Sequence, residues 1–158
     1  MRGAAAARRQ YRARRGRGRR PCRPRGDAAR RHARRPGLRQ CPVAAVHALA
    51  YPIGGLFHLP YGLSNALVLP HVLRFNAPAA AGEYAALAPL AGAGADLADG
   101  LAALSSRLGL PQRLRDVGVA AADLPRCVEE AMKQTGLLVN NPRPVTEADA
   151  RAIYEAAW

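Results

Sequence analysis

Charge divides this chain near residue 40, and the division confines folding to the second part. Residues 1–40 contain sixteen arginines and one acid, Asp27, which gives a net charge of +15. Leu38 is their only leucine, isoleucine or valine. Such a segment cannot bury enough apolar surface to offset the entropy lost on ordering. We therefore predict that residues 1–40 are disordered and that the folded domain lies within residues 41–158.

Three interpretations of residues 1–40 remain open. An Arg-rich segment binds phosphate backbones by counterion release, but this one has a single aromatic, Tyr11, and no RGG repeat. A mitochondrial presequence is rich in serine, whereas the first serine of this chain is Ser64. A shifted reading frame through GC-rich DNA also yields Arg, Ala, Gly and Pro. We therefore favour a misread or non-functional extension over targeting and over nucleic-acid binding.

Residues 41–73 carry no formal charge, which by itself is typical of a membrane-spanning helix. The run is interrupted, however, by prolines and histidines: Pro42, Pro52, Pro60, Pro70, His47, His58 and His71. A bilayer would have to satisfy every broken backbone hydrogen bond and solvate every imidazole. The three cysteines of the chain are an odd number without a C-x-x-C pair, as expected in a reducing compartment. We therefore expect a cytoplasmic protein with no membrane partner.

Turn and stop signals predict helices joined by short breaks in residues 41–158, with no strand pair. A first helix should end near Ala50, because the residue before Pro52 disfavours the helical conformation. A loop containing Gly54-Gly55 should follow and reverse the chain. We expect a second helix over about 62–76, kinked at Pro70.

The C-terminal half of the chain contains the clearest helical patterns. A short alanine-rich helix is expected over about 80–91. Residues 96–109 carry one apolar stripe at helical spacing, which consists of Leu97, Leu101, Leu104 and Leu108. Asp123 should cap a helix that stops at Gly136. Thr146 should open a last helix that buries Ala150, Ile153, Tyr154 and Ala157. The predicted fold class is all-α.

Residues 47–76 carry the candidate chemistry and read HALAYPIGGLFHLPYGLSNALVLPHVLRFN. His47 ends the first expected helix and Tyr61 precedes the second, so a chain reversal between them can bring both side chains into one pocket. Imidazole suits iron or zinc, and such an ion polarises a carbonyl or alkoxide oxygen. From spacing alone, a single histidine in an apolar helix is more often a core residue than a ligand.

The same stretch resembles the segment of iron-containing (group III) alcohol dehydrogenases written H-x-x-x-[HY]-P-x-G-G-x-F-x-x-P-H-G-x-x-N-A-x-x-L-P-H-V-x-x-[FY]-N. Residues 137–158 are similar to the end of that family, and the resemblance covers about 41–158. It implies the C-terminal helical domain of an oxidoreductase that uses Fe²⁺ or Zn²⁺ together with NAD(P). The substrate would be a small alcohol or aldehyde, and hydride would pass between its carbon and the nicotinamide.

The resemblance also assigns roles to three residues. His47 matches the first of two metal-ligating histidines, and Tyr61 stands where the second is expected. A phenol, with a pKa of about 10, is a poorer metal ligand than imidazole. Tyr51 matches a position beside the reacting centre, where it would relay a proton or orient the substrate. The alternative for Tyr51 is packing with a hydrogen-bonded hydroxyl, and His58 is a remote candidate for a substitute ligand.

The family's other two ligands, an Asp and a His spaced i, i+4, have no counterpart in residues 41–158. Residues 41–158 also lack the pattern of a strand, a Gly-rich turn and a helix that binds a dinucleotide. We therefore expect a truncated and inactive dehydrogenase fragment that does not bind Fe²⁺, Zn²⁺ or NAD(P) by itself. The alternatives are a non-enzymatic helical module that pairs with a separate N-terminal half or another copy, and an Arg-tailed nucleic-acid binder.

Overall fold

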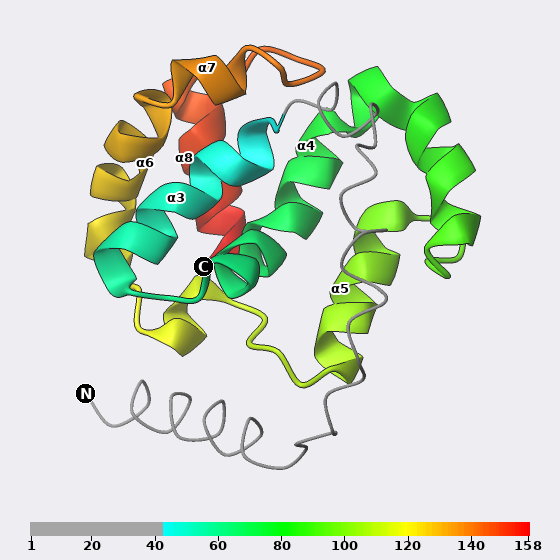
Figure 1. Ribbon diagram of the computed structural model, residues 1–158, viewed down its shortest axis with the longest axis horizontal. Helices are drawn as coiled ribbons and strands as arrows, with labels where there is room; N and C mark the ends of the chain where they lie inside the picture. The colour runs from blue at the N-terminus through cyan, green and yellow to red at the C-terminus, as the bar shows by residue number, and fades with distance from the viewer. Residues whose placement is uncertain (1–42) are drawn as a thin grey trace, which may run out of the picture. The chain divides into compact units, whose positions relative to one another are not determined.

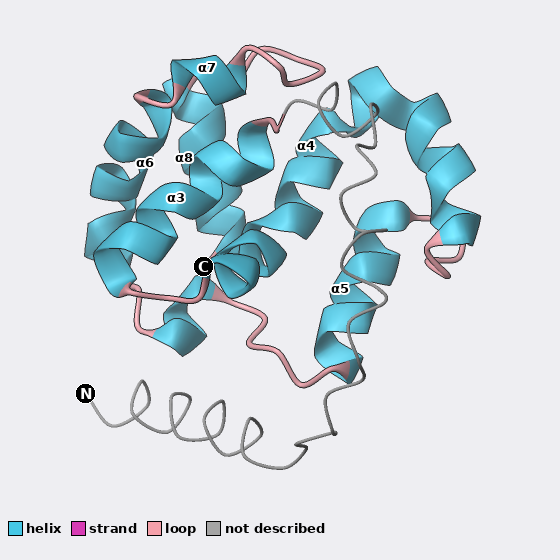
Figure 2. Ribbon diagram, viewed as in Figure 1, coloured by secondary structure: helices cyan, strands magenta, loops and turns pink. Residues whose placement is uncertain are grey.

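Helices make up all of the regular structure in residues 43–158, the part of the chain that the computed structural model describes (Figures 1 and 2). In chain order the elements are α3 (Ala45–Phe57), α4 (Tyr61–Leu90), α5 (Leu97–Arg107), the 3-10 turns η2 (Leu114–Val117) and η3 (Ala121–Asp123), α6 (Leu124–Met132), α7 (Thr135–Leu138) and α8 (Glu147–Ala157). The predicted all-α class is confirmed. Our predictions for residues 1–40 fall outside the described residues.

The larger of two apolar cores joins α3, the first half of α4, α6 and α8 (Figure 1). Its largest fully buried side chains include Leu49, Ile53, Val68, Val72, Leu114, Val128 and Tyr154. The last helix is the one that the sequence predicts best. The amide of Asp149 donates to the Thr146 hydroxyl at 3.2 Å, and the Thr146 amide donates to the Asp149 carboxylate at 2.9 Å. This capping box fixes the start of α8 and orients its apolar face toward the core.

The smaller core lies between α4 and α5 and is built from Leu73, Ala88, Ala93, Leu97 and Ala98. Asp96 caps α5 as predicted, because its carboxylate accepts a hydrogen bond from the amide of Asp99 at 2.9 Å. The leucine stripe of α5, however, is buried only at its N-terminal end. Leu104 is 36% exposed and Leu108 is 60% exposed. The sequence therefore predicts the helix correctly but overestimates how much of its apolar face is covered.

The prediction that the first helix ends near Ala50 is wrong, because α3 continues through Pro52 to Phe57. An internal proline costs a helix roughly 3 kcal/mol, but Pro52 and Ile53 are both buried here, and apolar burial offsets this cost. The expected Gly54-Gly55 loop is thus a helical turn. The chain reverses instead after Phe57, where His58 adopts the left-handed conformation with φ of 53°.

The structure also corrects two other boundaries. α4 runs without interruption past Pro70, and its only non-helical residue is Ala80, two residues after Pro78. The helix that begins after Asp123 ends at Met132 rather than at Gly136, and the short α7 follows it. The Asp123 carboxylate accepts a hydrogen bond from the Ala120 amide at 3.1 Å instead of capping α6. No helix among the described residues has the length and apolar character needed to cross a membrane.

Candidate functional site

The reversal between α3 and α4 places three aromatic side chains against one another. The ring centroids of His47 and Tyr61 lie 5.9 Å apart with planes inclined at 49°, and those of Tyr51 and Tyr61 lie 5.6 Å apart with planes at 28°. His47 and Tyr51 are four residues apart on α3 and therefore share one face of that helix. Tyr61 is the first residue of α4 and approaches that face across the reversal. We call these three residues the ring cluster.

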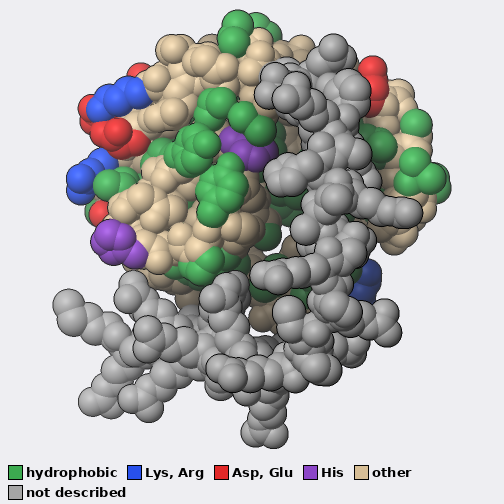
Figure 3. Space-filling view, in the orientation of Figure 1, with side chains coloured by type: hydrophobic (Ala, Val, Ile, Leu, Met, Phe, Trp, Pro, Cys, Tyr) green, Lys and Arg blue, Asp and Glu red, His purple; other side chains and the backbone are tan. Residues whose placement is uncertain are grey.

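The ring cluster is open to solvent on one side. Tyr51 and Tyr61 are 44% and 48% exposed, although both are large aromatic residues. On the face drawn in Figure 3, several hydrophobic side chains gather beside a histidine. Hydrogen bonding to Tyr61 is the main cause that raises the pKa of Tyr51, followed by the charge of Tyr61 and by burial. Tyr51 therefore keeps its proton at neutral pH, and in this arrangement its hydroxyl is hydrogen-bonded to Tyr61.

Side chains of α4 fix the position of Tyr61. The side-chain amide of Asn65 donates to the Tyr61 carbonyl oxygen at 2.8 Å, and the Ser64 hydroxyl donates to the Pro60 carbonyl oxygen at 3.3 Å. Gly54 allows α3 to come close, since a Cβ atom there would lie 3.4 Å from the Ser64 hydroxyl oxygen. Sequence reasoning missed Asn65. Its spacing could have indicated it, because Asn65 lies one helical turn after Tyr61 and its side chain can therefore reach the Tyr61 carbonyl oxygen.

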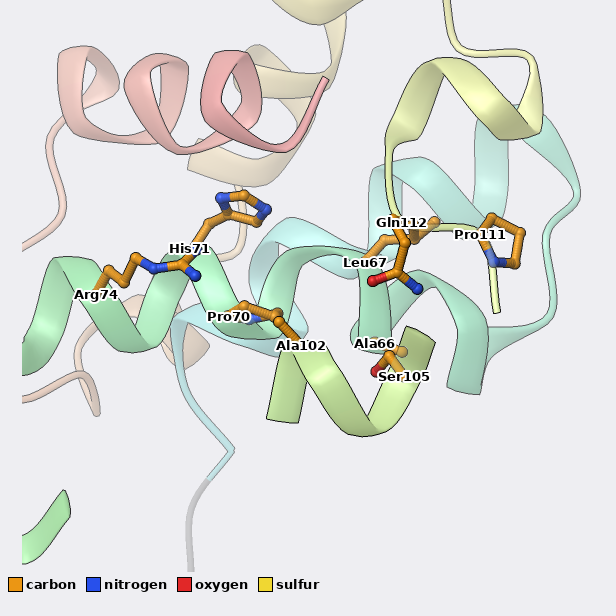
Figure 4. Close-up of a pocket in the computed structure, with 9 residues that line it drawn as sticks. All are labelled: Ala66, Leu67, Pro70, His71, Arg74, Ala102, Ser105, Pro111 and Gln112. Carbon is orange, nitrogen blue, oxygen red and sulfur yellow. The ribbon is translucent and has the colours of Figure 1, made fainter. Parts of the chain in front are cut away.

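The other two histidines of the described region, His58 and His71, lie outside the ring cluster. His58 is exposed at the end of α3. His71 lies on α4 beside a partly open cavity of about 190 Å³, which is lined by α4, α5 and the segment after α5 (Figure 4). Arg74 also lines this cavity, and its guanidinium pairs with the Asp99 carboxylate at 2.6 Å. Burial and, to a smaller extent, the charge of Arg74 lower the pKa of His71.

The ring cluster falls short of a complete metal site. Iron and zinc sites in proteins use about four ligands, chiefly imidazole, thiolate and carboxylate, whereas the cluster offers one imidazole and two phenols. Within residues 43–158, no three His, Cys, Asp or Glu side chains are grouped so that they could hold a metal ion. Tyr51 keeps its proton, which makes its oxygen a weak ligand. His47, Tyr51 and Tyr61 thus do not fit Fe²⁺ or Zn²⁺ by themselves, and their predicted roles stay predictions.

Comparison with known proteins gives one consistent result. Residues 37–158 match the model of the Fe-containing alcohol dehydrogenase family, C-terminal part. The 1,3-propanediol dehydrogenase of Citrobacter freundii is 37% identical over 123 residues, which cover 72% of this chain and 32% of that protein. Lactaldehyde reductase of Escherichia coli (strain K12) is 32% identical over 134 residues, which cover 77% of this chain and 34% of that protein.

Solved structures show the same likeness in three dimensions. An alcohol dehydrogenase from Oenococcus oeni superimposes with a TM-score of 0.67 at 30% identity, over 73% of this chain and 32% of that one. A 1,3-propanediol oxidoreductase gives a TM-score of 0.65 at 38% identity, again over 73% and 32%. The chain thus spans about a third of the length of the relatives that it matches.

Proposed function

The chain belongs to the Fe-containing alcohol dehydrogenase family, and from this premise we propose that it supplies the C-terminal helical part of a metal- and NAD(P)-dependent oxidoreductase. The relatives named for 1,3-propanediol and lactaldehyde support a small alcohol or aldehyde as the substrate. The observation that carries the proposal is the ring cluster, in which the chain reversal brings His47 and Tyr51 of α3 against Tyr61 of α4.

The part of the reaction that we assign to these residues is hydrogen bonding. Tyr51 retains its proton, and when substrate binds its hydroxyl exchanges the hydrogen bond to Tyr61 for one to the substrate oxygen, which holds the alcohol or aldehyde in one orientation. Tyr61 keeps the Tyr51 ring in place by stacking on it. His47 is the one good metal donor of the cluster, and an ion bound there needs further ligands from outside residues 43–158.

We further propose that residues 43–158 do not transfer hydride alone and that the dinucleotide is held by protein outside this region. The relatives are about three times longer than the part that matches, which leaves room for a cofactor domain. A complementing N-terminal half, supplied as a separate chain, is the main alternative arrangement. With added Fe²⁺ or Zn²⁺ and NAD⁺, we expect the purified chain to oxidise no alcohol, and Tyr61→His to restore no activity by itself.

A chimera tests the proposed function directly. Residues 43–158 replace the matching region of the Citrobacter freundii 1,3-propanediol dehydrogenase, and NADH formation from 1,3-propanediol is followed with and without added Fe²⁺. We expect weak turnover, which Tyr61→His raises at least tenfold by supplying a second imidazole, and which His47→Ala abolishes in both backgrounds. The exposed His58→Gln is the matched control and should leave the rate unchanged. A Tyr61→His chimera whose rate does not depend on His47 would refute the assignment.

A further inference from the structure

A tyrosine of the last helix reaches the turn of α3 that carries two members of the ring cluster. Tyr154, on α8, is fully buried, and its hydroxyl donates a hydrogen bond to the Leu49 carbonyl oxygen at 2.7 Å. Leu49 lies two residues after His47 and two residues before Tyr51. A single hydrogen bond from a distant helix therefore holds the middle of the segment that positions both side chains.

α3 lacks one of its own backbone hydrogen bonds in this region. Pro52 has no amide hydrogen, so the Ala48 carbonyl oxygen lacks its usual partner within the helix. No side chain caps the start of α3 at Ala44. At the other end, His58 adopts the left-handed conformation that glycine normally supplies. Contacts with other helices therefore contribute to the position of the turn between residues 47 and 51.

The Tyr154 hydroxyl is directed mainly at α3. Its second neighbour is the Cys127 carbonyl oxygen of α6, at a longer distance of 3.5 Å. Burial raises the pKa of Tyr154, so the hydroxyl keeps its proton and remains a donor at neutral pH. A phenylalanine here would fill nearly the same volume. The hydroxyl, rather than the ring, is what distinguishes Tyr154 from an ordinary core residue.

The segment that precedes α8 holds α4 in a comparable way. The side-chain amides of Asn76 and Asn141 exchange two hydrogen bonds, of 3.0 and 2.8 Å. The Arg143 guanidinium donates to the Phe75 carbonyl oxygen at 2.9 Å and lies over the Phe75 ring. The C-terminal part of the chain therefore contacts both helices that meet in the ring cluster, α3 through Tyr154 and α4 through Asn141 and Arg143.

We propose that Tyr154 is a positioning residue whose hydrogen bond to the Leu49 carbonyl sets how the rings of His47 and Tyr51 meet Tyr61. The inference deepens the proposed function, because it gives α8 a part in arranging the ring cluster. The geometry on which it rests exists whether or not the cluster takes part in a reaction.

The test observes the rings themselves in the full chain. Tyrosine and histidine rings are labelled with ¹³C, and Tyr51→Phe, Tyr61→Phe and His47→Gln assign their signals. In Tyr154→Phe we expect the Tyr51 and His47 signals to shift and the Tyr51–Tyr61 cross-relaxation peak to fall at least twofold. Val128→Ala is the matched control, since Val128 is buried in the same core on α6 but makes no hydrogen bond to α3. It should leave the ring signals in place.

Two further outcomes complete the test. Unchanged ring signals in Tyr154→Phe, or equal changes in Val128→Ala, would show that Tyr154 only fills space. If Tyr154→Phe does not fold, Ala50 is replaced by L-lactic acid in the full chain, so that the Leu49 carbonyl becomes an ester carbonyl, which is a weaker hydrogen-bond acceptor for Tyr154. A Tyr51–Tyr61 cross-relaxation peak that keeps its full intensity in this ester would equally overturn the inference. An inactive chimera with the expected ring shifts would refute the proposed function and leave this inference standing.

Discussion

The two apolar cores of the described region differ in how fully their helices are covered. In the larger core, α3 and α8 bury wide faces, and Leu49, Ile53 and Tyr154 are inaccessible to solvent. In the smaller core, α5 has the clearest leucine periodicity of the sequence, yet Leu108 is mostly exposed. Periodicity thus indicates which face of a helix is apolar, but the neighbouring helices decide how much of that face is buried.

The polar contacts follow the same division. Long-range hydrogen bonds to backbone carbonyls tie the larger core together, from Tyr154 to Leu49 at 2.7 Å and from the Trp158 indole to Val119 at 2.9 Å. The smaller core is joined across α4 and α5 by the exposed ion pair of Arg74 and Asp99, and such pairs stabilise by about 1 kcal/mol at most. The ring cluster belongs to the better-supported half, so we expect α5 to open before the cluster does.

The largest expected effect sets the two cores against each other directly. Leu49→Ala leaves a cavity in the larger core and should lower the free energy of unfolding by about 2–5 kcal/mol. Leu97→Ala removes the same atoms from the thin smaller core, where neighbours can relax, and should cost less than about 2 kcal/mol. Urea denaturation followed by circular dichroism measures both. Equal losses would mean that the two cores support the fold to the same extent.

A pair of glycines tests how tightly the smaller core is packed where α5 begins. A Cβ atom at Gly100 would overlap the Cα and Cβ atoms of Ala93, so Gly100→Ala should cost about 1–3 kcal/mol of stability. Gly82 lies within α4 with no atom within 4 Å of the added methyl. Gly82→Ala should therefore stabilise the protein by up to about 1 kcal/mol through helix propensity. Thermal unfolding should show shifts of opposite sign, and two shifts of the same sign would contradict this difference in packing.

Sequence reasoning succeeded where local interactions decide the structure. The start of α8 at Thr146 follows from a capping box within four residues, and the burial of Tyr154 follows from helical spacing. It failed at Pro52, where the local cost of a proline is outweighed by burial against distant helices. The meeting of His47 and Tyr61 was predicted from a reversal, but the bond from Tyr154 joins residues 105 positions apart and depends on tertiary packing.

The pH dependence of stability should report on the boundary between the cores, where His71 lies. Burial and Arg74 lower the pKa of His71, so the folded protein favours the neutral imidazole. Its contribution is complete above a pH of about 6.5, the usual pKa of histidine. As the pH falls, the unfolded chain binds a proton first, and stability is lost until the pH passes the lowered pKa. His71→Gln should therefore make the urea midpoint fall less steeply from pH 7 to 5, and an unchanged slope would contradict this.

The smallest effect is expected at the outer end of the leucine stripe. Leu108 is 60% exposed, so Leu108→Gln removes little buried apolar surface and should change the free energy of unfolding by no more than about 0.5 kcal/mol. Leu97→Gln is the matched substitution at the buried end of the same stripe and should cost several times more, because it places an amide among apolar side chains. Urea denaturation at two protein concentrations distinguishes the possible causes of a larger loss. A Leu108→Gln penalty above about 1 kcal/mol that grows with concentration would mean that another protein surface covers the stripe, since burial within one chain does not depend on concentration.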